Sequence, residues 1–147
     1  MEKKSKQGNF KEQGQSLVEL AVSLTILLML LAGTIDFGRA FFTWVTLRDA
    51  AQEGAVYASI DPTNDLEIEE RIFNVLERSN TIPDPRSNVE VTHDIDAAPC
   101  LGNTVTMVVD YPNFPITVPF LSTVLGTDTL SIHATVKDTI LYPACGE

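Results

Sequence analysis

The sequence predicts an α+β protein: a long N-terminal transmembrane helix that continues into a small extracytoplasmic domain with one packing helix and an antiparallel sheet of about three strands. Three observations predict this fold. An apolar run occupies residues 17–35, a segment of helical periodicity follows at 62–79, and three later segments alternate with a period of two. The 147 residues suffice for one domain and an anchor.

Charge is distributed unevenly along the chain. The formal net charge is −10. Residues 1–14 hold four lysines and two glutamates, a net charge of +2, so the remainder carries −12. Binding the phosphate backbone of a nucleic acid needs clustered Lys or Arg, so this balance argues against a nucleic-acid partner. Since the mean hydropathy is still +0.08, an apolar segment must adjoin an ordinary acidic domain.

The apolar run LVELAVSLTILLMLLAGTI, residues 17–35, has the length of a membrane span. It holds 19 residues with one ionisable group, Glu19. As a helix it measures about 28 Å, close to the roughly 30 Å hydrocarbon core. The lysines before it hold the N-terminus in the cytoplasm by the positive-inside rule, so the bulk of the chain lies outside.

Three kinds of N-terminus are compatible with such a run. A secretory signal peptide has about 7–15 apolar residues and a small-residue cleavage site. Here the run is longer, and the best candidate site, Gly38-Arg39-Ala40, contains an arginine. A signal anchor fits both length and charge. A pilin-type leader must explain Glu19, which could also be a tolerated acid near the cytoplasmic headgroups.

The spacing around Glu19 resembles the class III signal of type IV pilin-like proteins. In that family a membrane aspartyl prepilin peptidase cuts after a Gly that ends a short basic leader. Cleavage between Gly14 and Gln15 would place Glu19 at position five of the mature chain. The resemblance implies that Glu19 pairs with the N-terminal amine of a neighbouring subunit and sets the axial register of a filament.

Residues 14–59 are similar to the TadE-like domain. Its order and spacing are matched by Gly14, Glu19-Leu20-Ala21, the Leu-rich run, Asp36-Phe37-Gly38-Arg39, Ala50-Ala51 and Gly54-Ala55. There are two mild departures. The family more often has Glu at the position of Asp36, and it has Ala-Arg where this chain has Ala55-Val56.

The resemblance implies a non-enzymatic structural protein of pilus biogenesis, a minor pilin or pseudopilin of a tight-adherence (Tad/Flp) system. It implies a prepilin peptidase, other pilins, an inner-membrane platform and an assembly ATPase as partners, besides membrane lipid. The protein would sit in the cytoplasmic (inner) membrane as a single-pass protein or in the extracellular pilus. The alternative is an unprocessed single-pass envelope protein whose outer domain binds a ligand or a partner protein.

The helix is expected to continue beyond the span, over about residues 16–59 and about 66 Å, because no proline precedes Pro62. Ala50, Gly54 and Ala58 recur every four residues, a spacing that lets another backbone approach closely. Four aromatic residues follow the span and fit either an aromatic belt at the membrane interface or core contacts to the domain. They are Phe37, Phe41, Phe42 and Trp44.

The outer domain, residues 60–147, is expected to begin with an amphipathic helix at 62–79, capped by Asp61 and opened by Pro62. The domain limits are thus 1–14, 15–59 and 60–147. A turn at 82–87, strands at 88–96, 103–111 and 129–142, and a proline-containing loop at 112–128 with a helical turn at 120–126 complete the prediction.

Two cysteines, Cys100 and Cys145, flank the sheet region. Outside the cytoplasm two cysteines in a small domain usually pair. Closing this loop would restrict the unfolded chain by about 4 kcal/mol in the entropic model. Free thiols in a reducing compartment are the alternative, against which the predicted topology argues.

No catalytic constellation is recognisable. His93 and His133 fall on predicted strands and are expected to be structural. His93 with Asp94 and Asp96 imitates a metal site, without recognisable ligand spacing. No phosphate-binding loop and no G-x-S-x-G motif occur in the sequence, so no enzyme activity, metal or cofactor is expected.

Overall fold

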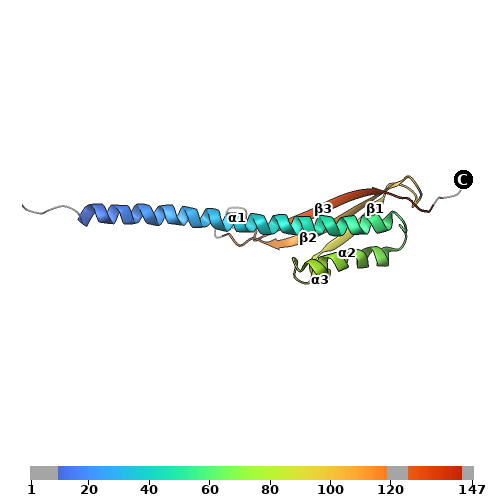
Figure 1. Ribbon diagram of the computed structural model, residues 1–147, viewed down its shortest axis with the longest axis horizontal. Coiled ribbons are helices and arrows are strands. Elements are labelled where there is room, and N and C mark those ends of the chain that lie inside the picture. The colour runs from blue at the N-terminus through green and yellow to red at the C-terminus, as the bar shows by residue number, and fades with distance from the viewer. Residues whose placement is uncertain (1–9, 119–125, 144–147) are drawn as a thin grey trace, which may run out of the picture.

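One long helix carries the entire molecule, and a small α+β domain is built around its second half (Figure 1). The computed structural model describes residues 10–118 and 126–143, with side chains from residue 14 onward. Its elements are α1 (Phe10–Ala58), α2 (Asp65–Ser79), α3 (Pro85–Asn88), β1 (Glu90–Ile95), β2 (Thr104–Pro115) and β3 (Thr129–Thr139). The predicted α+β class is confirmed.

Helix α1 has 49 residues, about 74 Å of continuous helix. It begins at Phe10, earlier than the predicted start near Ser16, and ends at Ala58. Its C-terminal end is tied to the chain that follows β3. The carbonyl of Ser59 accepts hydrogen bonds from the amides of Leu141, at 2.7 Å, and Tyr142, at 3.2 Å.

The three strands form one antiparallel sheet in the order β1-β2-β3. The predicted alternation is confirmed in the central strand, because Val105, Met107, Val109 and Tyr111 are all buried while their neighbours are half-buried. This face of the sheet packs against α1, which contacts both β2 and β3. Side-chain burial on this face sets the register of the sheet.

The core lies where α1, α2 and β2 meet. Helix α2 supplies a buried stripe at helical spacing, Ile68, Ile72 and Leu76, each with no exposed surface. Leu47 of α1 and Met107 of β2 are equally buried and belong to the same cluster. The second half of α1 is therefore a core element, in contrast to its first half.

Strand β2 is longer than predicted. Tyr111 was the expected last residue, but the strand continues to Pro115, with a register shift between Tyr111 and Phe114. Strand β1 pairs only as far as Asp110, so beyond this residue β2 has a single neighbour, β3. Prolines are tolerated at bulges and on edges, where a missing amide breaks no ladder bond.

Helix α2 starts three residues later than predicted. The expected cap, Asp61, instead belongs to a turn in which its carboxylate accepts a bond from the Thr63 hydroxyl at 3.3 Å. The observed N-cap is Asn64, whose side chain accepts a bond from the amide of Glu67 at 3.4 Å. Asn and Asp cap equally well, so the sequence pattern alone favoured the wrong one.

The predicted turn at 82–87 contains a single helical turn, α3. Arg86 links it to α2: its Nε donates to Glu77 at 2.7 Å and its Nη2 donates to Glu70 at 3.0 Å. These bonds, that to Glu77 first, raise the pKa of Arg86 above its ordinary value. The helical turn predicted at 120–126 lies, apart from Gly126, outside the described residues.

Candidate functional site

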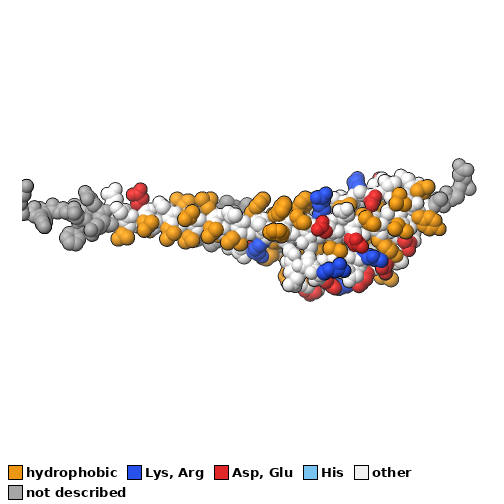
Figure 2. Space-filling view, viewed as in Figure 1, with side chains coloured by type: hydrophobic (Ala, Val, Ile, Leu, Met, Phe, Trp, Pro, Cys, Tyr) orange, Lys and Arg blue, Asp and Glu red, His pale blue; other side chains and the backbone are white. Residues whose placement is uncertain are grey.

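The first half of α1 projects from the domain with its side chains uncovered. Every described side chain from residue 14 to 31 is exposed, and most of them are hydrophobic (Figure 2). Within Gly14–Ala58, none of the residues in an apolar stretch of 18 residues is buried. Such a surface requires a membrane or other helices around it, so the helix fits a single-pass membrane protein.

The predicted processing and assembly residues lie at the start of this uncovered stretch. Gly14, Gln15 and Glu19 are all exposed on α1. A side chain at Gly14 would meet nothing within 4 Å. Among the described residues Glu19 has no ion-pair partner, so its carboxylate is available for a contact with another molecule.

The aromatic residues beyond the span all have exposed surface. Phe37 and Phe42 are 73% and 67% exposed, Phe41 is 50% exposed and Trp44 is 38% exposed. Phe41 contacts both Phe42 and Trp44, with ring centroids 6.1 and 6.2 Å apart. Of the two roles that the sequence allowed, exposure at this position favours the aromatic belt.

The ladder of small residues is used within the chain. Ala50, Gly54 and Ala58 are buried, and Gly54 lies against Ile72 of α2. A Cβ on Gly54 would lie 2.6 Å from both Cδ1 and Cγ1 of Ile72. The close approach that the spacing predicted is thus made by α2 of the same molecule.

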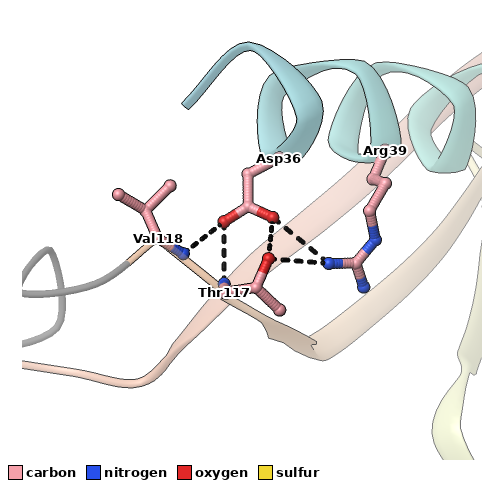
Figure 3. Close-up of polar contacts among 4 residues, drawn as sticks. All are labelled: Asp36, Arg39, Thr117 and Val118. Carbon is pink, nitrogen blue, oxygen red and sulfur yellow. Dashed lines mark hydrogen bonds and ion pairs between the residues drawn. The ribbon is translucent and has the colours of Figure 1, made fainter. Parts of the chain in front are cut away.

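A carboxylate at the junction of span and domain joins α1 to the chain after β2 (Figure 3). Oδ2 of Asp36 accepts hydrogen bonds from the backbone amides of Thr117, at 2.7 Å, and Val118, at 2.8 Å. Oδ1 accepts a bond from the Thr117 hydroxyl and one from Nη1 of Arg39 at 3.2 Å. We call these four residues the Asp36 clamp.

The Asp36 clamp satisfies a buried charge completely. Asp36 is 8% exposed, and its four donors include two backbone amides and one cation. A carboxylate this far from water is stable only when such partners surround it. Sequence reasoning treated Asp36 as a motif residue without a role. The available signal was an acid directly after an apolar run, but its partners lie 81 and 82 residues away.

A small pocket opens beside the Asp36 clamp. It has a volume of about 210 Å³. Arg39, Phe42 and Thr43 of α1 form one wall, Thr81 and Pro83 a second, and Tyr111, Phe114 and Pro115 of β2 a third. The Arg39 guanidinium lies over the Phe114 ring, 5.3 Å from its centroid. The pocket is therefore apolar with a single cation at its edge.

The predicted disulfide involves Cys145, which lies outside the described residues, so the pairing stays a prediction. The backbone near both cysteines is nevertheless joined. The amide of Leu101 donates to the carbonyl of Pro143 at 2.9 Å, and that of Gly102 donates to Ile140 at 2.9 Å. Cys100 and the chain just before Cys145 are therefore neighbours.

In the described part of the chain, neither histidine belongs to a group of side chains arranged to bind a metal ion. There, no group of three His, Cys, Asp or Glu side chains could hold a metal ion. His93 is half-buried on β1, with its Nε2 3.4 Å from Oδ1 of Asp65, and His133 is exposed on β3. The predicted structural roles of these two residues remain predictions.

Comparison with known proteins bears on α1. Residues 14–56 match the family model of TadE-like proteins. The N-terminal segment is therefore similar to TadE-like proteins. This match confirms the resemblance that the sequence predicted and supports a pilus-associated protein; the TadE-like family is not an enzyme family. No curated protein and no solved structure matches the chain.

The TadE-like segment contains only one side of the Asp36 clamp and of the contact at Gly54. Asp36, Arg39 and Gly54 lie inside it, whereas their partners Thr117 and Ile72 lie outside. The matched segment therefore holds the membrane helix and one side of its contacts with the domain.

Proposed function

We propose that this protein is a minor pilin or pseudopilin of a tight-adherence (Tad/Flp) pilus, cleaved after Gly14 by a prepilin peptidase and assembled through α1. The observation that carries the proposal is the combination of a TadE-like match over residues 14–56 with a helix whose first half is apolar and uncovered. Pilin-like subunits need such a helix first in the membrane and then among other helices.

On this proposal the chain has three parts with different fates. The basic leader, 1–14, remains in the cytoplasm and is removed. The helix, 15–59, anchors the mature chain in the inner membrane, and the acidic domain, 60–147, is extracytoplasmic. Its partners are the peptidase, other pilins, the platform and the assembly ATPase.

The decisive experiment is to determine the N-terminus of the full chain after co-expression with its cognate prepilin peptidase. Intact mass and N-terminal sequencing should identify Gln15 as the first residue. Gly14→Val should leave the leader attached. Gly33→Val is a matched control on the same helix: a side chain at Gly33 also meets nothing within 4 Å, so this variant should be cleaved normally.

The result also separates the two proposed classes of protein. An intact Met1 in the wild-type chain, in cells where the same peptidase processes a known substrate, would exclude the pilin class. The protein would then be an unprocessed envelope protein that acts through its outer domain.

A further inference from the structure

The pocket beside the Asp36 clamp lies at the depth of the lipid headgroups. Arg39 is four residues beyond Ile35, the end of the apolar run, which corresponds to about 6 Å along the helix. Headgroups add roughly 5–8 Å to each side of the hydrocarbon core. In a membrane-inserted chain, the pocket wall formed by α1 therefore starts within the headgroup layer.

Arg39 is held in one orientation, but some of its hydrogen-bond donors have no partner among the described residues. Its Nη1 donates to Asp36 and to the Thr117 hydroxyl, both at 3.2 Å, and its plane lies over the Phe114 ring. Its Nε and Nη2 make no hydrogen bond within the described residues, and its side chain is 43% exposed. A guanidinium fixed in this way presents a ready pair of donors to a phosphate oxygen.

The Asp36 carboxylate partly neutralises Arg39 but faces away from the remaining donors of that side chain. Both of its oxygens are occupied by the clamp, and it points toward Thr117 and Val118, while the second terminal nitrogen of Arg39 points away from the carboxylate (Figure 3). Arg39 is the one charged residue among those that line the pocket. The mature chain is strongly acidic and repels an anion at long range, so binding must come from direct hydrogen bonds to Arg39.

The size and walls of the pocket indicate which part of a lipid it accepts. At about 210 Å³ it is below the roughly 300–1,000 Å³ of typical drug-sized ligand sites. The aromatic side chains in its walls can pack against the glycerol and the first acyl carbons of a phospholipid; they are Phe42, Tyr111 and Phe114. The volume suits a phosphate ester, with the acyl chains remaining in the bilayer.

We propose that this pocket binds the phosphate group of a phospholipid of the outer leaflet, with Arg39 as its donor. The bound lipid would seat the outer domain on the membrane surface while the protein is membrane-resident. This inference rests on the membrane topology of the proposed function, but not on cleavage or on pilus assembly.

The test uses the full chain in detergent and native mass spectrometry. Phosphatidylglycerol is titrated, with diacylglycerol, which lacks the phosphate, as the comparison lipid. The wild-type chain should bind one phosphatidylglycerol saturably and no diacylglycerol. Arg39→Gln should weaken binding at least tenfold, about 1.4 kcal/mol. The control Arg48→Gln, about 20 Å beyond the apolar run, should bind as the wild type does.

A second variant keeps the test independent of the clamp. Thr81→Phe narrows the pocket from another wall and leaves Asp36 and Arg39 themselves unchanged, and it should also weaken binding. Equal binding by the wild type and Arg39→Gln would overturn the proposal. If inorganic phosphate at the same concentration displaced the lipid, the site would bind free phosphate and its assignment to a lipid would be wrong. Flotation with vesicles tests membrane insertion separately. A chain that floats but forms no lipid adduct therefore refutes the proposed lipid site and leaves the membrane topology intact.

Discussion

Asp36 connects the membrane helix with a part of the domain far away in sequence. Its carboxylate holds the amides of Thr117 and Val118 and is itself held by Arg39. Arg39 adds a hydrogen bond to the Thr117 hydroxyl and lies over the ring of Phe114. Asp36 and Arg39 together therefore fix this end of the domain to the helix.

Asp36→Asn should weaken the clamp while keeping its shape. In either orientation the amide places its NH2 group against a donor, either the backbone amides or Arg39, and an unsatisfied buried group costs about 1–3 kcal/mol. The free energy of unfolding in detergent should fall by this amount, and hydrogen exchange at Thr117 and Val118 should accelerate. Asp49→Asn, an exposed acid on the same helix, is the control. Unchanged exchange at both amides would refute the role of the clamp.

Glu19 presents a different problem at the residue scale, because it has no partner among the described residues. A carboxylate buried between packed helices is costly unless it is paired. Cleavage would create a cationic α-amine on Gln15. In an assembly, this amine on a neighbouring subunit is the partner that we propose.

Glu19→Leu should leave membrane insertion intact and impair incorporation into the pilus. Ser23→Leu, one helical turn further along, raises the hydrophobicity at a comparable place and should not affect assembly. Membrane fractionation measures insertion, and the subunit content of sheared pili measures incorporation. Normal incorporation of Glu19→Leu would exclude the pairing.

At the scale of elements, periodicity predicted the helices and strands, and local capping and pairing set their limits. The alternation in β2 identified its buried face correctly. Its continuation to Pro115 could not be predicted, because whether a proline is tolerated depends on where β1 stops pairing. Likewise, the choice between Asp61 and Asn64 as the cap of α2 depends on the tertiary position of the turn.

The contact between α1 and α2 depends on the absence of a side chain at Gly54. Gly54→Ala would place a Cβ 2.6 Å from Ile72 and should destabilise the domain by about 1–3 kcal/mol. Gly38→Ala is the matched control, since its Cβ meets nothing within 4 Å; greater helix propensity should make this variant neutral or slightly more stable. Thermal unfolding compares them.

Adding Ile72→Val to Gly54→Ala removes a methyl group from the point of collision. The double variant should recover part of the lost stability. Equal unfolding temperatures for Gly54→Ala and Gly38→Ala would show that the contact between the helices is not tight at Gly54.

At the scale of the whole molecule, the chain after β3 returns to the C-terminal end of α1, the end of the domain farthest from the membrane span. The carbonyl of Ser59, directly after α1, accepts hydrogen bonds from two backbone amides of this segment, and the amide of Leu101 donates to the carbonyl of Pro143. The predicted bond between Cys100 and Cys145 would lock this arrangement covalently. Opening the bond should lower the stability by about 4 kcal/mol in the entropic model.

Alkylation of the native protein followed by non-reducing mass analysis measures this directly. Two unmodified cysteines joined to each other are expected, and two alkylated cysteines would disprove the pairing. Cys100→Ser, Cys145→Ser and the double variant should have the same reduced stability, because each one removes the same bond.

The candidate site was predictable only as far as it is local in sequence. The signal around Gly14 and Glu19 is contained in a few residues, and the TadE-like match confirms the resemblance of that segment. The Asp36 clamp and its pocket combine α1 with residues near 81 and 117, which the topology alone brings together. A single sequence contains no pairing information at such a separation.

The unbroken helix α1 also forms a rigid mechanical link between the membrane segment and the outer domain. Because α1 runs without interruption from the uncovered stretch into the core, the domain cannot swivel independently of the membrane segment. Each residue of an α-helix advances about 1.5 Å and turns about 100°. A displacement of α1 along its axis, or a rotation about it, must therefore move the outer domain by the same amount. Force applied at the membrane thus reaches the outer domain both as an axial force and as a torque.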